Sequence, residues 1–230
     1  MSALYGTGRL YFPDERDAEY PVAAVLPTES TTGIKRRHWW DGAWSGNQGQ
    51  TPQCVAYSLA HWVNDGPALH SMFHSRRPGF DLRELYCEAQ KIDPWPGDCS
   101  NHQYDGTSVR AGAKVLQRWG LIQEYRWATT IDEVVRTLLE HGPVVAGTWW
   151  YQGMFYPNVE GIITPSGARD YGHAYLLNGV DLETGLIRIK NSWGPYWGIG
   201  GSAYISIEHM DHLLKLYGEV CVPIPVTPER

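Results

Sequence analysis

One cysteine of this sequence lies in a segment whose residue types could support nucleophilic chemistry. The segment reads Gly46-Asn47-Gln48-Gly49-Gln50-Thr51-Pro52-Gln53-Cys54-Val55-Ala56, with Gln48 six residues before Cys54. A thiol attacks a carbonyl carbon as the thiolate, so the pKa of a catalytic cysteine must fall below its ordinary value of about 8.5. Apolar residues continue at helical spacing as far as Val63, which predicts a helix that starts at or near Cys54. The dipole and the free N–H groups of a helix N-terminus would favour a negative sulfur there.

A histidine and an asparagine further along the chain could complete such a site. His173 follows Gly172 and opens the apolar run 174–177, which reads as a buried strand that would hold the imidazole in one orientation. The imidazole could pair with the thiol and later protonate a leaving amine. Asn191 follows the predicted strand 186–190, and its amide oxygen could accept a hydrogen bond from one ring nitrogen and so aim the other at sulfur.

Each of these side chains also has an ordinary structural explanation. A free cysteine is more often a small buried packing residue, and Asn191 could simply form a turn at a strand end. Asp170 and Asp181 flank the histidine strand and are rival groups for orienting the imidazole. Gln48 could be a loop residue, or its side-chain amide could stabilise a tetrahedral oxyanion together with the backbone N–H of the cysteine. The order Gln, Cys, His, Asn favours the catalytic interpretation.

That order and the local sequences resemble the papain-like cysteine peptidases. The resemblance extends from about Trp39 to Ile207 and includes Asp105-Gly106-Thr107-Ser108-Val109, a segment common in bacterial-type members. It is most specific at Lys190-Asn191-Ser192-Trp193-Gly194-Pro195-Tyr196-Trp197-Gly198. The resemblance implies that Trp193 shields the His–Asn hydrogen bond from water and that Gln48 contributes to the oxyanion hole.

The resemblance also implies a substrate pocket. The second subsite would be lined near Val144 and Ala174, with Gly106 close to the substrate backbone. Small apolar walls would admit an apolar side chain N-terminal to the scissile bond. Helical periodicity comes first in the sequence and strand periodicity follows it, which predicts the α+β class. This order agrees with the layout of the family. A helical lobe would carry the cysteine, a β-barrel-like lobe would carry the histidine and asparagine, and the substrate cleft would lie between them.

The individual elements are predicted from periodicity and from helix caps. The spacing indicates helices that end near Gly120 and at Gly142-Pro143, and a hairpin turn at Glu183-Thr184-Gly185. Residues 1–38 carry no helical periodicity and are expected to form a leader of strand and loops on the β lobe, with the peptidase domain at 39–230. The predicted helices cover 54–63, 81–92, 109–116 and 130–139, and the predicted strands cover 144–150, 173–180, 186–191 and 202–207.

The sequence departs from the family at two places. Thr51 stands where many members carry a cysteine bonded elsewhere in the helical lobe, and residues 1–38 are too short for the usual helical propeptide. A Cys87–Cys99 bond is possible, although spacing alone cannot establish it. Four cysteines with one assigned to catalysis leave an odd number, which suits a reducing compartment. Without the apolar core of a signal peptide at its N-terminus, the chain is expected to be cytoplasmic.

Composition excludes several other functions. The chain has 230 residues, 43% of them hydrophobic, and a net charge of −6, so no basic patch suggests nucleic acid and no long apolar run suggests a membrane span. No closely spaced Cys/His cluster predicts a metal, and no glycine-rich phosphate loop predicts an organic cofactor. The expected partners are a polypeptide substrate and a proteinaceous inhibitor or regulator.

The sequence therefore predicts a cysteine peptidase that works through a Cys54 thioester. Two alternatives stay open at this point. The same site could transfer acyl groups or hydrolyse a non-protein amide. The chain could also be a silent binding module on a papain-like scaffold, in which case an intact site would need a blocked cleft, for example by residues 1–38.

Overall fold

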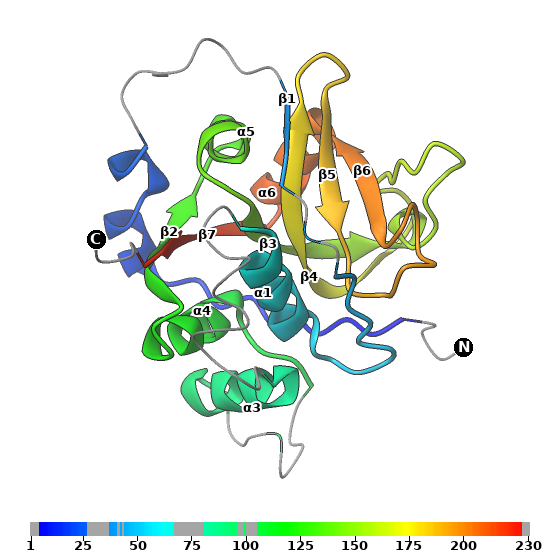
Figure 1. The fold of residues 1–230 in the computed structure, drawn as a ribbon. Helices are drawn as coiled ribbons and strands as arrows, with labels where there is room; N and C mark the ends of the chain where they lie inside the picture. Colours follow the sequence, from blue (N-terminus) through cyan, green and yellow to red (C-terminus); the bar gives the residue numbers. More distant parts are fainter. Residues whose placement is uncertain are drawn as a thin grey trace.

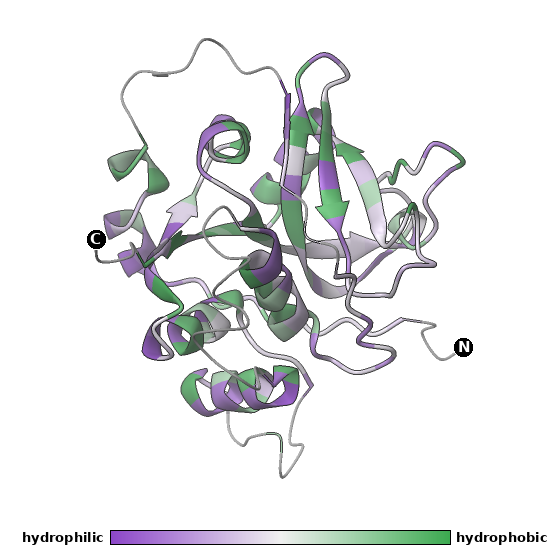
Figure 2. Ribbon diagram, in the orientation of Figure 1, coloured by the Kyte–Doolittle hydropathy of each residue, from purple (hydrophilic) through white to green (hydrophobic). Residues whose placement is uncertain are grey.

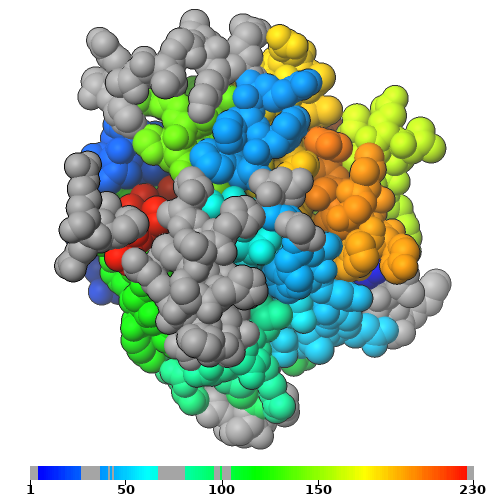
Figure 3. Space-filling view, viewed as in Figure 1, coloured from blue at the N-terminus to red at the C-terminus, as the bar shows by residue number. Residues whose placement is uncertain are grey.

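The fold consists of a helical lobe and a β-rich lobe. The computed structural model describes residues 5–26, 37–40, 42, 44–66, 81–95, 99 and 105–226. Helices α1 (Cys54–Asp65), α3 (Leu82–Ile92) and α4 (Val109–Arg118) form the helical lobe, in which α1 and α4 pack against the sheet and α3 packs against both of them (Figure 1). Figure 3 shows the same division on the surface, with α3 and α4 in green on one side of this face and β4, β5 and β6 in yellow and orange on the other. The α+β layout with two lobes that the sequence predicts is confirmed.

The β-rich lobe is built on an antiparallel sheet of seven strands in the order β2-β7-β3-β4-β5-β6, with β1 paired to β4. Helices α5 (Ile131–Glu140) and α6 (Ile207–Lys215) pack against it, and three short 3-10 helices complete the connections. The strands are β1 (Arg37–Trp39), β2 (Ile122–Ala128), β3 (Val144–Tyr151), β4 (Arg169–Asp181), β5 (Leu186–Lys190), β6 (Ser202–Ser206) and β7 (Glu219–Pro225). The 3-10 helices are η1 (Glu15–Glu19), η2 (Val22–Ala24) and η3 (Gln152–Met154).

Side-chain caps explain where most of the helices begin. Thr130 forms both halves of a capping box with Glu133 at the start of α5, and Ser108 accepts a hydrogen bond from the Ala111 N–H at the start of α4. Asp81 accepts from the Arg83 N–H at the start of α3. Helix α1 differs, because the side chain before its first residue makes no capping hydrogen bond.

Alternation along the strands divides the core into two parts. Val145 and Leu176 face the helical lobe, whereas their neighbours Ala146 and Tyr175 face α5 and α6. Figure 2 shows the corresponding pattern in the helices, where green and purple alternate along α3 and α5. The central strands are thus buried on both sides, and the helical lobe packs directly onto β3 and β4.

A buried ionic cluster joins the two lobes. Asp65 at the end of α1 accepts hydrogen bonds from Lys190 Nζ on β5 at 2.9 and 3.0 Å and from Asn178 Nδ2 on β4 at 3.0 Å. Lys190 Nζ also donates to the Gly42 carbonyl at 2.7 Å. Burial raises the pKa of Asp65, while the Lys190 ammonium lowers it. Both charged groups are buried, so each is stabilised by the opposite charge of the other.

The structure extends and corrects several sequence predictions. The helices after Cys54, Asp81, Ser108 and Thr130 are confirmed, but β2, β7 and α6 were not predicted. Strand β4 begins at Arg169, so His173 lies inside the strand rather than at its start. Polar residues interrupt β2, and two prolines lie in β7, which hid both strands from a periodicity argument.

Cys87 of α3 and Cys99 form a disulfide, and the free thiols are Cys54 and Cys221, both buried. The cysteine count therefore no longer supports a reducing compartment.

Among the residues described, no helix combines the length and apolar character that crossing a bilayer requires.

Candidate active site

Cys54 is the first residue of α1 and lies against β4. Its Sγ accepts a hydrogen bond from the Ala174 N–H at 3.4 Å, and its side chain is fully buried. At this end of α1 the backbone N–H groups of Cys54 and Val55, like that of Ala174, lower the pKa of the Cys54 thiol and so favour an anionic sulfur. The contact with β4 places the sulfur beside the strand that carries His173.

His173 is held by Asn191. Their side chains bond through His173 Nε2 and Asn191 Oδ1 at 2.8 Å, and the Ser192 N–H donates to the same Oδ1 at 2.7 Å. An atom that accepts from a backbone N–H must be the amide oxygen, so Nε2 carries the proton. The other ring nitrogen, Nδ1, is buried without a hydrogen-bond partner and keeps its lone pair. This is the tautomer that a base next to the Cys54 thiol requires.

Aromatic rings enclose the imidazole. Trp193 stacks on His173 with ring centroids 4.8 Å apart, and Trp150 approaches its edge at 4.9 Å. Trp193 also stacks on Tyr5 at 4.6 Å. The His173–Asn191 hydrogen bond is therefore surrounded by apolar rings rather than by solvent.

Gln48 is buried in the loop before α1 and tied to the residue after Asn191. Its Nε2 donates to the Thr51 carbonyl at 2.6 Å, and its Oε1 accepts from Ser192 Oγ at 2.5 Å. The Gln48 backbone N–H donates to the Ser192 carbonyl at 2.8 Å. His61 supports this loop from α1, because its Nε2 accepts from the Gly46 N–H at 3.0 Å. One N–H of the Gln48 side chain stays free for a further acceptor.

Cys54, His173, Asn191 and Gln48 thus come together in one buried site, whereas neither rival carboxylate bonds to His173 in the described part of the chain. Asp181 is paired with Arg37 at the far end of β4. Asp170 is also on β4, and no hydrogen bond joins it to His173 among the described residues. Of the three candidates, Asn191 is the one that hydrogen-bonds to the ring.

The N-terminal residues 5–10, here called the crossing segment, run over this site. The Gly6 N–H donates to the Gly49 carbonyl at 2.9 Å, and the Gly8 and Arg9 N–H groups donate to the Gly172 carbonyl at 3.1 and 3.0 Å. Trp193 Nε1 donates to the Gly6 carbonyl at 2.9 Å. Figure 1 shows this dark-blue segment crossing the molecule from the N-terminus to η1, beside β2.

The crossing segment continues along the helical lobe. The Thr107 N–H donates to the Gly8 carbonyl at 3.0 Å, and the Leu10 N–H donates to the Thr107 carbonyl at 2.9 Å. A Cβ built on Gly106 would lie 2.1 Å from the Gly8 oxygen, so only glycine permits this approach. The expected leader segment therefore contacts both lobes and not the β lobe alone.

Burial sets the protonation of the covered site. It raises the pKa of the Cys54 thiol to about 12. It lowers the pKa of His173 to about 4, against the opposing effect of the hydrogen bond to Asn191. With the crossing segment in place, the pair is a neutral thiol and a neutral imidazole.

The structure places the two residues that flank the expected substrate pocket on opposite faces of the sheet. Ala174 faces the helical lobe beside Cys54, but Val144 packs into the other half of the core, towards α5. On the helical-lobe face, the β3 residue paired with Ala174 is Gly147. A shift of one position along a strand moves a side chain to the opposite face of the sheet. The sequence alone did not establish the register between β3 and β4.

Two site residues were missed by sequence reasoning, Arg9 and Glu219. The side chain of Arg9 reaches Glu219 at the start of β7, with Nε 2.8 Å from Oε1. A single carboxylate at the head of the apolar run 219–222 was the available signal. Its partner lies 210 residues earlier in the chain, and no local pattern connects them.

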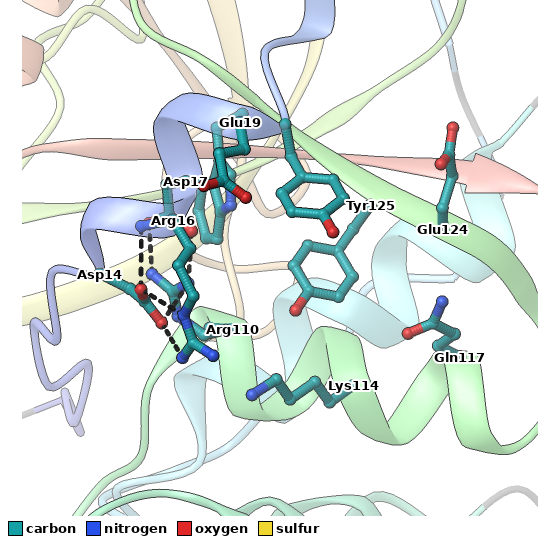
Figure 4. Close-up of a pocket in the computed structure, with 11 residues that line it drawn as sticks. Asp14, Arg16, Asp17, Glu19, Arg110, Lys114, Gln117, Glu124 and Tyr125 are labelled. Atoms are coloured by element: carbon teal, nitrogen blue, oxygen red, sulfur yellow. Dashed lines mark hydrogen bonds and ion pairs between the residues drawn. The ribbon is translucent and has the colours of Figure 1, made fainter.

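A hollow between η1, α4 and β2 marks the other end of the N-terminal region (Figure 4). Asp14 and Asp17 of that region are paired with Arg110 of α4, and Asp14 is also paired with Arg16. These ion pairs hold the chain against α4 after it has crossed the site. Within the described residues, no group of three or more His, Cys, Asp or Glu side chains could hold a metal ion.

Fold and site together define a two-lobed thiol hydrolase scaffold, and comparison with known proteins gives its family. The profile described as papain family cysteine protease matches residues 86–224, more than half of the chain. The chain belongs to the papain family of cysteine proteases. The matched stretch contains His173 and Asn191 and begins after Cys54.

Solved structures of low sequence identity share the fold. The chain is similar to xylellain, a cysteine protease from Xylella fastidiosa, with a TM-score of 0.73, 21% identity and 99% of each chain covered. It is also similar to the digestive procathepsin L2 proteinase of Tenebrio molitor, with a TM-score of 0.65, 17% identity, and 96% of this chain and 78% of the other covered.

One curated relative aligns with part of the sequence. A cysteine protease of Blomia tropicalis is 31% identical over 91 residues, which are 38% of this chain and 27% of that protein. The match therefore spans about a quarter of that relative.

Proposed function

We propose that this chain hydrolyses peptide bonds with Cys54 as nucleophile. The observation that carries the proposal is the joint geometry of Cys54 Sγ, bonded to the Ala174 N–H, and the adjacent His173, oriented by Asn191. The tautomer of His173 leaves Nδ1 without a proton, as a base requires. The membership in the papain family supports the same reaction class.

The reaction begins when the crossing segment leaves and water reaches the site. Burial then no longer opposes charge, so the proton of the Cys54 thiol passes to His173 and leaves a thiolate beside an imidazolium. The sulfur attacks the carbonyl carbon of the substrate, and the oxygen takes up negative charge. The Cys54 N–H and the free N–H of Gln48 are the donors available to that oxygen.

The intermediate collapses with breakage of the C–N bond, and His173 gives its proton to the leaving amine. The acyl group remains on Sγ as a thioester. Water then attacks the thioester carbon while His173 accepts a proton from the water. The C–S bond breaks, the acid product is released and the Cys54 thiol is regenerated. Asn191 keeps the ring in one orientation through both stages.

The test is hydrolysis of an unfolded protein such as reduced casein, combined with mass-spectrometric mapping of thiol alkylation. Cys54→Ala and His173→Ala should each abolish hydrolysis. Cys221→Ser is the matched control, because Cys221 is also a buried free thiol but lies on β7 away from Asn191. Loss of activity in Cys221→Ser, or full activity in Cys54→Ala, would remove the assignment.

One observation favours a second candidate, the silent binding module. The crossing segment bonds to Gly49, Thr107 and Gly172 around the site, so a site that stays covered would be chemically intact but inactive. Absence of hydrolysis together with absence of Cys54 alkylation, over hours and across pH 5–8, would favour this candidate. Transfer of the acyl group to added hydroxylamine in preference to water would instead identify an acyl transferase.

A further inference from the structure

His61 is a buried histidine that takes no part in the reaction steps described above. It lies on α1 seven residues after Cys54, which is about two helical turns, so both side chains lie on the same side of the helix. The ring is fully buried and lies against Trp44, with the ring centroids 4.7 Å apart. A second imidazole is thus carried by the helix of the nucleophile, about 10 Å along its axis.

One hydrogen bond accounts for the polar contacts of this ring. Its Nε2 accepts from the Gly46 N–H at 3.0 Å, so the ring proton is on Nδ1. Nδ1 is buried and has no partner in the described part of the chain. Burial lowers the pKa of His61 to about 3, with a further contribution from the Lys190 ammonium. The ring is therefore neutral near pH 7 and serves as a hydrogen-bond acceptor.

The unpartnered Nδ1 of His61 is unfavourable for folding. A buried donor without an acceptor costs about 1–3 kcal/mol. An apolar side chain such as leucine would avoid this cost and fill a similar space. Leucine could not supply the acceptor for the Gly46 N–H, which belongs to a buried residue as well. The bond to Gly46 is therefore what a histidine provides at this position.

Gly46 begins a short antiparallel ladder that connects two segments of the site. The Gly194 N–H donates to the Gly46 carbonyl at 3.0 Å, and Asn47 forms an antiparallel bridge with Trp193. The pairing continues through the backbone N–H of Gln48. The place of the Gly46 peptide therefore sets the place of Gln48, whose side chain is a donor for the oxyanion.

Helix α1 lies directly against this ladder. A Cβ built on Gly46 would lie 2.6 Å from Tyr57 Cδ1 and 2.8 Å from Trp44 Cη2, so glycine permits the close approach. The Tyr57 hydroxyl donates to the Asn47 carbonyl at 3.0 Å in an exposed hydrogen bond, for which water can substitute. The bond from the Gly46 N–H to His61 is enclosed, so water cannot replace it.

The two oxyanion donors come from the two parts that His61 connects. The Cys54 N–H is at the start of α1, and the Gln48 side chain extends from the ladder. Both donors must lie about 2.7–3.1 Å from one oxygen position to stabilise an oxyanion. A displacement of about 1 Å can lower a rate about 100-fold. The bond between His61 and Gly46 fixes the separation of helix and ladder, and with it the separation of the donors.

We propose that His61 is a positioning residue of the oxyanion hole, which holds Gln48 at its working distance from Cys54 through the Gly46 N–H. This inference rests on the proposed peptidase function and adds a residue to its machinery. His61 acts on reactions in which negative charge develops on a carbonyl oxygen. It leaves the nucleophilicity of the Cys54 sulfur unchanged, because that depends on His173.

The test compares two reagents that react with the same sulfur of the full-length protein. With 4-nitrophenyl acetate, Sγ bonds to the acetyl carbon through a tetrahedral oxyanion, 4-nitrophenolate leaves, and the thiol proton passes through His173 to solvent. With iodoacetamide, Sγ displaces iodide directly, and no charge develops on the carbonyl oxygen. The ratio of the two rates measures oxyanion stabilisation, because access to Cys54 affects both rates alike. Cys54→Ala gives the background of acetylation elsewhere.

His61→Leu should lower the ratio of acetylation to alkylation about 10- to 100-fold. His61→Gln should restore the ratio, because its amide oxygen can accept from the Gly46 N–H. Ser58→Ala is the matched control, since Ser58 is a buried polar residue of the same helix whose Oγ donates to the Val55 carbonyl. It should keep the wild-type ratio. If His61→Leu does not fold, His61→Asn replaces it, because that polar side chain is too short to reach Gly46.

A double variant shows whether the effect passes through Gln48. In Gln48→Ala the side-chain donor is absent, so the addition of His61→Leu should lower the ratio no further. Additive losses would mean that His61 acts elsewhere and would overturn the proposal. An unchanged ratio in His61→Leu, or a ratio that His61→Gln does not restore, would overturn it as well.

Hydrolysis of reduced casein by the same proteins separates this inference from the proposed function. A lower ratio in His61→Leu, with no casein hydrolysis by the wild type, would support the role of His61 and contradict the peptidase function. Casein hydrolysis by the wild type, with an unchanged ratio in His61→Leu, would support the peptidase function and overturn the role of His61. No acetylation of Cys54 in the wild type would overturn both.

Discussion

At the scale of single residues, the protonation of His173 links the covered site to stability. Burial holds its pKa near 4 in the folded chain, whereas an unfolded histidine titrates near about 6.5. Between these values the folded state binds fewer protons than the unfolded state. The free energy of unfolding therefore falls as the pH drops from about 6.5 to about 4, and this residue accounts for about 3 kcal/mol.

The prediction is tested with His173→Gln, which removes the titration and keeps a polar partner for Asn191. Urea unfolding of wild type and variant at pH 7 and pH 4 gives four free energies. The loss between the two pH values should be smaller in the variant. His61, with a pKa held near 3 by burial, affects both proteins equally and cancels in the comparison. Equal losses in the two proteins would contradict the buried neutral state of His173.

The residues of the site differ in how far the sequence revealed them. Cys54, His173 and Asn191 each stand in a recognisable local sequence, so their chemistry could be argued before the fold was known. Glu219 and Arg9 have no such context. They meet because β7 returns to the centre of the sheet and the N-terminus crosses it, which are long-range features that periodicity does not encode.

At the scale of elements, the crossing segment is held by backbone contacts that tolerate no added side-chain atoms. Gly8 has φ +145° and a Cβ built on it would lie 2.4 Å from the Pro52 carbonyl oxygen. Gly8→Ala should therefore loosen the segment and expose Cys54. A strained backbone position costs about 1–3 kcal/mol, which corresponds to about 5- to 150-fold in the population of the open state.

Alkylation of Cys54 by iodoacetamide under native conditions measures that population. Thr7→Val is the control, because it lies in the same segment, makes no hydrogen bond through its side chain in the described structure and changes shape little. Gly8→Ala should react about ten times faster than wild type, and Thr7→Val at the wild-type rate. Identical rates in all three proteins would show that the segment does not control access to the thiol.

Helices and strands with clear caps, stop residues or alternating apolar positions were the ones that the sequence predicted well. Helix α5 has both a complete capping box and a glycine–proline stop, and its predicted and observed bounds nearly coincide. Strand β7 lacks alternation and contains two prolines, and it is stabilised by pairing with β2 and β3. Hydrogen bonding to the neighbouring strands therefore stabilises β7 in the absence of a strong local sequence preference.

At the scale of the whole molecule, the cluster of Asp65, Lys190 and Asn178 fixes how the lobes meet. Removal of one member of a buried ion pair leaves the other charged and unsolvated. Lys190→Met should therefore lower the free energy of unfolding by about 3–5 kcal/mol. Asp65→Asn combined with Lys190→Met removes both charges and should recover part of that loss.

Urea denaturation measures these differences, with Lys215→Met as the control. Lys215 also pairs with an aspartate, Asp211, but its side chain is 73% exposed. Exposed pairs contribute about 1 kcal/mol or less, so the control should stay close to wild type. A small effect of Lys190→Met would mean that the lobes do not depend on the cluster.

The complete enclosure of Cys54 has a consequence for the lifetime of the enzyme. A catalytic thiolate that faces solvent is oxidised by peroxide to sulfenic acid and then, irreversibly, to sulfinic and sulfonic acids. In the covered chain the sulfur is 0% exposed and protonated, so neither the accessibility nor the charge that oxidants need is present. Folding with its own N-terminus across the site therefore preserves the nucleophile in its reduced form until a peptide takes that place.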